Sequence, residues 1–306
     1  MRGTFELRGM ITTPNSLFNI VQEFLTRHIV NIESLDNIPE VVGEEIFKRA
    51  IENKAFQHYQ QAERCLELFL SAYKGALLSS VCLQNSLRLI NEYTDPIIRL
   101  CKYLVHLDLS HCHLGDDHEI ITALSQLTDL KTLKLKDVNL SDIGMRKITL
   151  PTRMFAKGPV NLRTLILSDN GGITDKSLHS LSCYRALTTV DLSSTNATRA
   201  GVVVLGQRLG LHLSSAPYGC RVIDEGWAAP VLLQWQQQME EAVAERRRKR
   251  QLDSPTKTGL FSYKKRVCLW QLSPRKSPGS ESGSLVLRDV PDPQVPVPFA
   301  AARKLF

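Results

Sequence analysis

Apolar residues recur along the middle of the chain with a spacing that changes within each unit. The segment from Leu104 to Leu114 places apolar residues at its positions 1, 4, 6 and 11, with Cys112 at position 9. Related copies start at residues 78, 130, 162 and 187, so consecutive starts lie 26, 26, 32 and 25 residues apart. Alternation with period 2 predicts a strand, and the spacing of about 3.6 that follows it predicts a helix. The chain should therefore contain five strand and helix units.

Units of this length and spacing are typical of leucine-rich repeats. We expect an α/β solenoid, a short horseshoe of about five repeats with one parallel sheet and a helix per repeat, similar to the ribonuclease-inhibitor type. Ser141 and Thr174 precede acidic residues and should cap helix N-termini. The 32-residue interval contains Pro151 and Pro159. We expect these prolines to end a helix and to form a loop over residues 150–160.

The segments on either side of the array predict caps. Residues 16–29 form an amphipathic pattern with Leu17, Ile20, Val21, Phe24, Leu25 and Ile29 on one face, and two more helical segments follow before the first repeat. They should close the N-terminal end of the core. After the last repeat, Trp227, Val231, Trp235 and Met239 stand four apart, which predicts a helix that buries both tryptophans against the last repeat. The expected organisation is a flexible start (1–15), a helical N-terminal cap (16–77), repeats (78–212), a C-terminal cap and helix (213–250) and a tail (251–306).

Charge separates the tail from the rest of the chain. Residues 241–306 hold 14 Lys and Arg against 6 Asp and Glu, and they contain 7 of the 14 prolines. Such a composition buries little apolar surface, so residues 251–306 are expected to be disordered. The seven cysteines are scattered without a CxxC pair, which favours reduced thiols, and the start of the chain lacks the apolar region of a signal peptide.

A specific resemblance adds to this interpretation. The segments SLFNIV, IESLDNIPEVVGEEIF, LVHLDLSHCHLGDDHE and EGWA with the following VLLQW together resemble the leucine-rich-repeat-containing protein 42 family of animals. The resemblance covers roughly residues 16–250 and extends to KKRVCL at 264–269. It implies a nonenzymatic repeat protein, nuclear in location. The Pro- and Ser-rich tail departs from the family pattern, so functions of the tail carry over least.

The concave face of the horseshoe is the first candidate for binding a partner. Between the buried leucines, each strand and the turn after it present polar residues of mixed sign to that face. Such a surface suits a protein or peptide better than a phosphate backbone, which would require Lys and Arg in successive strands. The alternative is a merely solvated sheet face. The candidate residues are His106, Asp108, Ser110, His111, Thr132, Lys134, Lys136, Asp137, Ser168, Asp169, Asp191 and Ser193.

Catalysis and metal binding find little support in the sequence. His106, His111, Cys112, His113 and His118 lie close together, but the inward slot of Cys112 keeps them from converging on one ion. No Gly-rich phosphate loop, GxSxG, HExxH or protease-type Cys signature occurs. We therefore predict a protein that is not an enzyme and has no metal site and no cofactor.

The tail carries short motifs that suggest regulated nuclear import. Two basic clusters have the bipartite form that an importin recognises, and they predict a nuclear protein; the alternative is a solvated charge run. Three Ser-Pro sites suit a cyclin-dependent kinase, and RKLF at 303–306 resembles a cyclin-docking motif. Phosphorylation at roughly −1.5 to −2 charges per site would offset much of the tail's basic charge. The residues are Arg246, Arg247, Arg248, Lys249, Arg250, Lys264, Lys265 and Arg266 for import, Ser254, Ser273 and Ser277 for phosphorylation, and Arg303, Leu305 and Phe306 for cyclin docking.

Two further functions remain as alternatives to a scaffold or adaptor. SLFNIVQEFL resembles the elongin-C-binding box of ubiquitin-ligase substrate receptors, with Leu17 entering the partner's pocket, although Val21 stands where Cys is usual. A plain capping role for these helices is the competing interpretation. The basic tail would also allow binding to nucleic acid without sequence preference and with strong dependence on salt.

Overall fold

The computed structural model describes residues 16–57, 59–214, 221–252 and 286–288. Five short parallel strands, one per repeat, stack in chain order. Their pairing joins Ser80 to His106, Thr132, Thr164 and Thr189 in one continuous register. The strands are β1 (Ser80–Cys82), β2 (His106–Asp108), β3 (Thr132–Lys134), β4 (Thr164–Ile166) and β5 (Thr189–Asp191). The predicted leucine-rich-repeat solenoid and its register are confirmed.

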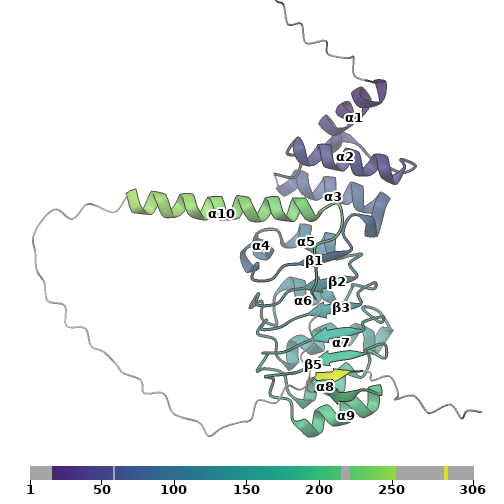
Figure 1. The fold of residues 1–306 in the computed structure, drawn as a ribbon, viewed down its shortest axis with the longest axis vertical. Helices are drawn as coiled ribbons and strands as arrows, with labels where there is room; N and C mark the ends of the chain where they lie inside the picture. The colour runs from purple at the N-terminus through teal and green to yellow at the C-terminus, as the bar shows by residue number, and fades with distance from the viewer. Residues whose placement is uncertain (1–15, 58, 215–220, 253–285, 289–306) are drawn as a thin grey trace, which may run out of the picture.

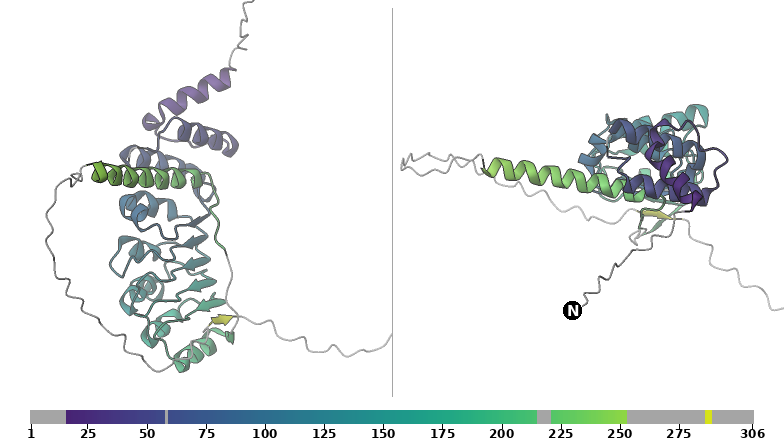
Figure 2. Two further views of the ribbon diagram at one scale, coloured as in Figure 1. Left: turned by 60° about the vertical axis from the view of Figure 1, so that its left-hand side comes forward. Right: turned by 90° about the horizontal axis from the view of Figure 1, so that it is seen from above.

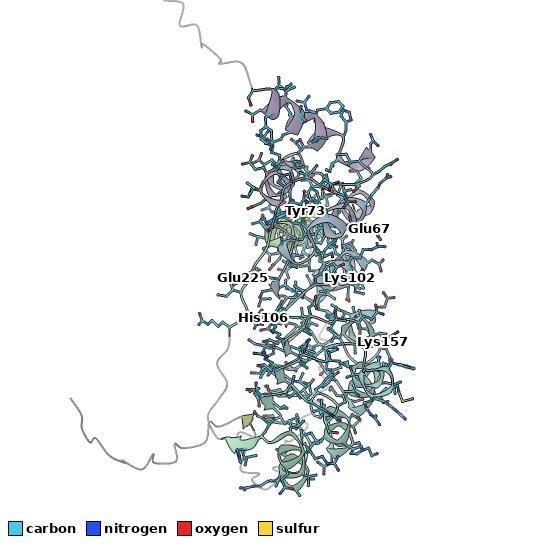
Figure 3. The ribbon with its side chains drawn as sticks, turned by 90° about the vertical axis from the view of Figure 1, so that its right-hand side faces the viewer. Glu67, Tyr73, Lys102, His106, Lys157 and Glu225 are labelled. Atoms are coloured by element: carbon cyan, nitrogen blue, oxygen red, sulfur yellow. The ribbon has the colours of Figure 1, made fainter. Side chains whose placement is uncertain are left out.

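Helices line the side of the stack opposite to the sheet, as Figure 1 shows. In Figure 3, the labelled His106 and Lys157 mark these two sides, the sheet side and the helix side. The helices are α1 (Leu17–Arg27), α2 (Glu40–Glu52), α3 (Tyr59–Tyr73), α4 (Leu87–Glu92), α5 (Thr94–Cys101), α6 (Glu119–Leu124), α7 (Asp142–Phe155), α8 (Asp175–Leu181), α9 (Arg199–Leu209) and α10 (Ala229–Leu252). Among these residues, no helix combines the length and the apolar character needed to span a membrane.

The repeat leucines form one continuous core between sheet and helices. Leu104, Leu107 and Leu109 are fully buried, as are their counterparts in the next repeats. Position 9 of the repeat holds Cys112, whose thiol donates to the carbonyl of Leu83 at 3.0 Å. Position 9 of the repeat that starts at residue 162 holds Asn170, and its side-chain amide nitrogen donates to the Leu135 carbonyl at 2.7 Å. In these two repeats a small buried donor therefore ties the turn to the previous repeat, whereas Val138 fills the same position in the third repeat.

Aspartates link the N-termini of successive helices. Each carboxylate accepts a hydrogen bond from the backbone N–H of the capping Ser or Thr in the following repeat, at 2.8 to 2.9 Å. The capping hydroxyl donates to the same carboxylate and caps its own helix. The pairs are Asp116 with Ser141, Asp142 with Thr174, and Asp175 with Thr198. The predicted caps at Ser141 and Thr174 are confirmed, and they also join neighbouring repeats.

The expected break at Pro151 does not occur. Helix α7 runs through Pro151 and ends at Phe155, where Ala156 adopts a left-handed conformation and its N–H contacts the carbonyls of Pro151 and Thr152. A proline removes one backbone N–H, and therefore one hydrogen bond, from a helix, so the loss of helix stability is confined to a single turn. The longest repeat therefore accommodates most of its extra residues by lengthening its helix, and only residues 156–160 form the loop.

Helix α10 lies at the opposite end of the array from the one we predicted. The chain returns from β6 (His212–Ser214), and the N–H groups of Ser79 and Glu225 pair with the carbonyls of Glu225 and Ser80 along β1. A Cβ on Gly226 would lie 2.5 Å from the Leu77 carbonyl oxygen, so only glycine allows this approach. Figure 2 shows α10 crossing the N-terminal end and projecting beyond the body.

The prediction that α10 caps the last repeat is therefore wrong. Trp235 is fully buried at the N-terminal end, where its indole N–H donates to the Phe56 carbonyl at 2.8 Å and its ring stacks on Tyr93. Trp227 packs against Phe47 and Tyr73 instead of the last repeat. The apolar stripe indicates which face of α10 is buried, but both ends of a solenoid expose apolar surface.

Helix α1 also departs from the expected packing. It faces α2 with its polar side, so that Gln22 and Thr26 are buried and the Asn53 amide donates to the Thr26 hydroxyl at 3.3 Å. The predicted core face points outward, and Leu17 is 77% exposed and Phe24 62% exposed. Of the six apolar residues predicted to pack inward, only Ile29 is fully buried.

One strand lies in the segment predicted to be a disordered tail. Residues Val286–Arg288 form β7, which pairs antiparallel with both β5 and β6. The sheet order is therefore β1-β2-β3-β4-β5-β7-β6. The sequence pattern did not predict this strand, because residues 286–288 lie outside the repeated leucine spacing that identified β1 to β5.

Candidate functional site

The C-terminal ends of the strands enclose a polar cavity of about 340 Å³ on the concave face. Parallel strands in register bring equivalent repeat positions side by side, so side chains distant in sequence meet there. The cavity is lined by Gln84, Asp108, Ser110, His111, Lys134, Lys136, Ile166, Ser168, Asp191 and Ser193. Eight of our twelve predicted face residues are among them. We call this set the concave cavity.

Asp108 lies at the centre of the hydrogen bonds in the concave cavity. Its carboxylate has no solvent exposure, and it accepts hydrogen bonds from the Gln84 amide at 2.8 Å and the Ser110 hydroxyl at 2.6 Å. The Lys134 ammonium lies 3.1 Å away with a side-chain exposure of 11%. Burial acts to raise the pKa of Asp108, but the hydrogen bonds from Ser110 and Gln84, together with Lys134, outweigh it and lower the pKa.

This pair differs from our expectation of a freely exposed face. Asp108, Thr132 and Lys134 lie on the concave side but are almost fully covered, because neighbouring strands of a narrow parallel sheet pack their side chains against one another. An ion pair with so little solvent exposure holds its side chains in place, since separating it would leave a buried charge. The accessible polar groups are therefore those at the margin of the cavity.

Lys136, from the third repeat, and Asp191, from the fifth, provide accessible charges of opposite sign to the concave cavity. The Lys136 side chain is 42% exposed, and its ammonium lies 3.4 Å from the Asp169 carboxylate. Asp191 accepts a hydrogen bond from the Ser193 backbone N–H at 3.0 Å, repeating the arrangement of Asp108 with Ser110. The cavity thus presents accessible charges of both signs.

The remaining predicted face residues lie outside the concave cavity. His106 and Thr132 occupy the first positions of β2 and β3, away from the cavity at the C-terminal strand ends. Asp137 accepts contacts from His111 at 3.0 Å and His113 at 3.5 Å. His118 is instead directed to Asn91 and to the N-terminus of α6. Within the part of the chain that the structure describes, no group of three or more metal-ligating side chains is arranged to hold an ion.

Two cavity residues were missing from our candidate set. Gln84 occupies in the first repeat the position that Ser110 and Lys136 occupy in the next two, so extending the register to the degenerate first copy would have found it. Ile166 is the strand position equivalent to Asp108 and Lys134. Its apolar side chain gives the cavity a hydrophobic floor beside the charges.

Only part of the predicted tail motifs falls within the described residues. Arg246, Arg247, Arg248 and Lys249 are exposed on the last turns of α10, which also includes Arg250. The Lys249 ammonium pairs with the Glu245 carboxylate at 2.7 Å. Outside the described residues lie Lys264, Lys265, Arg266, Ser254, Ser273, Ser277, Arg303, Leu305 and Phe306.

Comparison with known proteins agrees with this fold. A sequence profile described as Leucine Rich repeat matches residues 100–117 and 159–182. Leucine-rich repeat-containing protein 42 of Rattus norvegicus is 35% identical over 87% of this chain and 64% of its own length. The proteins of the same name from Homo sapiens and Danio rerio are each 36% identical over 76% of this chain, which corresponds to 56% and 59% of their lengths. The chain thus spans less than two thirds of these relatives.

Proposed function

The chain belongs to the leucine-rich-repeat proteins, and most of it is similar to leucine-rich repeat-containing protein 42. From that premise we propose that the chain is a non-enzymatic scaffold or adaptor. Its concave cavity and the surrounding face bind a protein partner. One observation carries this proposal: the repeat register gathers side chains from successive repeats around a single cavity with accessible charges of both signs. The chain offers an open, curved sheet face of the kind that repeat proteins use for binding.

The chemistry of the concave cavity favours a protein over a nucleic acid. A phosphate backbone selects surfaces of continuous positive charge. Here Lys134 is neutralised by Asp108, and Lys136 lies beside Asp169. Charges of both signs beside the apolar floor at Ile166 instead suit a polypeptide that presents both acidic and basic groups.

Charge reversal at the margin of the cavity tests the proposal. We would substitute Lys136→Glu together with Asp169→Lys, because both side chains are about 40% exposed and the exchange keeps the net charge. The matched control is Lys48→Glu with Glu44→Lys, which exchanges an exposed ion pair on α2 and also keeps the net charge. Proximity labelling followed by pull-down should find a set of proteins that the control retains and the cavity variant loses. Equal recovery of all captured proteins by the two variants would overturn the proposal.

The basic clusters support nuclear import as part of this function. An importin binds basic side chains on an extended chain, so recognition of Arg246 to Arg250 requires the last turns of α10 to unwind. Substitution of residues 246–250 and 264–266 by Ala should shift a fluorescent fusion from nucleus to cytoplasm. Unchanged nuclear accumulation would remove the import hypothesis. Phosphorylation of Ser254, Ser273 and Ser277 by a cyclin-dependent kinase is proposed as the regulation, and phosphomimetic Asp at these sites should weaken import.

A second candidate function rests on the outward face of α1. Leu17, Ile20 and Phe24 are each more than half exposed, as a residue that enters an elongin C pocket would have to be. In this alternative the chain is a substrate receptor of an elongin-C ubiquitin ligase. Co-purification with elongin C should disappear in Leu17→Ala and persist in Leu233→Ala, a matched control on α10 that is 56% exposed. Absence of co-purification with the unaltered protein would dismiss this candidate.

A further inference from the structure

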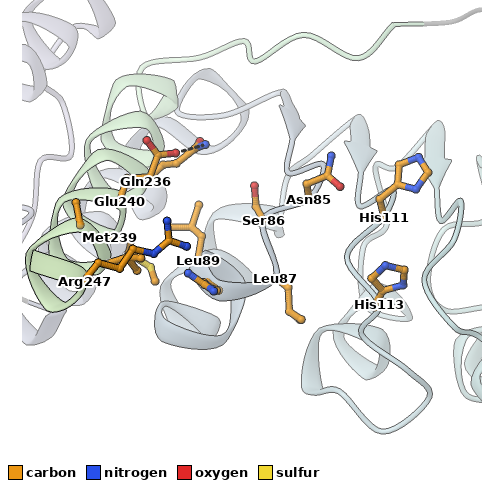
Figure 4. Close-up of a pocket in the computed structure, with 13 residues that line it drawn as sticks. Asn85, Ser86, Leu87, Leu89, His111, His113, Gln236, Met239, Glu240 and Arg247 are labelled. Carbon is orange, nitrogen blue, oxygen red and sulfur yellow. Dashed lines mark hydrogen bonds between the residues drawn. The ribbon is translucent and has the colours of Figure 1, made fainter. Parts of the chain in front are cut away.

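A larger cavity lies outside the concave face, between α4 and the projecting part of α10. It has a volume of about 710 Å³ and opens to solvent beside the turns after β1 and β2. Figure 4 shows α10 with Met239 and Arg247 on one wall, and Leu87 and Leu89 on the other. We call this space the α4–α10 groove. It adjoins the concave cavity at His111, which lines both.

The two walls of the groove are held apart by the anchoring of α10. Trp235 is fixed by its hydrogen bond to the Phe56 carbonyl and by stacking on Tyr93, with ring centroids 4.4 Å apart. One turn later, Met239 is only partly buried, and Val243 follows after one more turn on the same side. Because the helix is rigid and fixed at one end, these two apolar side chains remain partly exposed at the opening.

The rim of the groove is cationic above an apolar floor. Arg88 and Arg247 both line the groove, and Arg246 joins them in the adjoining cavity along the same helix. Among residues 16–57, 59–214 and 221–252, no carboxylate forms an ion pair with Arg88 or Arg247. Of the described residues that line the groove, only Glu240 is acidic, and its carboxylate accepts a hydrogen bond from Gln236 at 3.3 Å. Glu92 lines the adjoining cavity, together with Arg88, Arg246 and Arg247. The rim therefore attracts negative charge.

We propose that the α4–α10 groove binds an acidic amphipathic segment of a partner protein. An apolar side chain of that segment enters between Leu89 and Met239, and neighbouring carboxylates pair with Arg88 and Arg247. Arginine recognises carboxylates through two parallel N–H donors, which adds direction to the contact. A nucleic acid would match the arginines but would leave the partly exposed side chains of Leu87, Met239 and Val243 without an apolar ligand. This binding is separate from the concave face and does not depend on it.

A model peptide provides the direct test. The probe is a fluorescein-labelled peptide of three Glu-Leu-Leu-Glu units, compared with peptides of Lys-Leu-Leu-Lys and Glu-Ser-Ser-Glu units. Fluorescence anisotropy with the full chain at 0.15 M salt should show the first peptide binding at least tenfold more tightly than the other two. Equal binding of the Lys peptide would mean that the rim charges do not select the ligand, and equal binding of the Ser peptide would mean that the apolar floor does not. Either result would overturn the proposal.

Substitutions in the α4–α10 groove test whether the Glu-Leu peptide binds there. Arg88→Glu with Arg247→Glu should weaken binding of the Glu-Leu peptide at least tenfold, and Met239→Ser several-fold. Both arginines are exposed, so the fold should persist, which circular dichroism would verify. Two controls should leave binding unchanged: Arg146→Glu with Lys176→Glu, and Lys264→Gln with Lys265→Gln and Arg266→Gln. Loss of binding in the tail control but not in the groove variant would assign the attraction to the tail and refute the groove.

Discussion

Replacing Trp235 by Ala tests the position of α10 at the N-terminal end of the repeats. Trp235 has no solvent exposure and is the largest fully buried side chain of the described residues. Its substitution removes the stacking on Tyr93 and leaves a cavity beneath α10. Truncation of a buried aromatic side chain to Ala costs about 3–5 kcal/mol. We expect the docked state of α10 to be destabilised by about 3–5 kcal/mol.

A conservative variant separates the hydrogen bond from the packing. Trp235→Phe keeps most of the ring but removes the donor to the Phe56 carbonyl, which is 2.8 Å away. Leaving a buried acceptor without a partner costs about 1–3 kcal/mol. The Phe variant should therefore lose clearly less stability than the Ala variant. Leu233→Ala, on the exposed side of the same helix, should stay within about 0.5 kcal/mol of the unaltered protein.

Hydrogen exchange of α10 gives the most local measurement of this loss, and urea denaturation gives the global one. A reduction of 3–5 kcal/mol corresponds to opening that is about a hundredfold or more easier, because each 1.4 kcal/mol is a factor of ten. Amides of residues 231–239 should exchange faster by that factor in Trp235→Ala. If Trp235→Ala matches Leu233→Ala in exchange and in urea midpoint, α10 is not docked where the structure places it, and our reasoning fails.

Three further predictions concern polar groups that are partly or fully buried. Asp142→Asn should destabilise the fold by about 1–2 kcal/mol in urea denaturation, because the carboxylate accepts hydrogen bonds from the N–H and the hydroxyl of Thr174 in the next repeat. Asp117→Asn, at a fully exposed position, should change stability little. Asp108 has a lowered pKa, so the stability it contributes is complete above its ordinary pKa of 3.8 and is lost as pH falls below that value. Urea midpoints from pH 7 to pH 3 should therefore fall less steeply in Asp108→Asn, and an identical slope would contradict the assignment. Burial raises the pKa of Cys101 to about 12 and of Cys112 to about 11, so iodoacetamide at pH 8 should label both only after unfolding. Rapid labelling of the native protein would show that these thiols are not buried.

The repeat array could be predicted because its signal is local and repeated. Each strand position follows from the spacing of leucines within one unit, and five units confirm each other's register. The capping residues followed for the same reason, since Ser141 and Thr174 lie next to the helices they cap. The concave residues were largely correct as a set, because alternation in a strand determines the face on which a side chain lies.

The packing of the flanking helices could not be predicted in the same way. An amphipathic stripe identifies a face but not the surface that covers it, so the tryptophans of α10 were equally compatible with either end of the solenoid. The choice depends on Phe56 and Tyr93, which lie more than a hundred residues earlier. Helix α1 shows the converse case, because polar contacts with Asn53 and Arg49 orient it with its apolar face outward.

The buried ion pair between Asp108 and Lys134 could not be predicted from the sequence pattern either. Sequence spacing places both residues on the concave face, but it does not show how closely neighbouring strands cover them. This covering makes the pair a poor choice for a binding variant, since reversing one charge would bury it without a partner. The accessible residues Lys136 and Asp169 are better probes of binding.

Site-specific photocross-linking tests the central claim that the concave face binds a protein partner. A benzoylphenylalanine would replace Lys136 at the margin of the concave cavity, or Lys176 on the helix side as the control. Cells that produce either variant would be irradiated, and the cross-linked products would be identified by mass spectrometry. Our account predicts discrete cross-linked proteins at Lys136 that are absent at Lys176. Cross-links that are equal at both positions, or present only at Lys176, would contradict it.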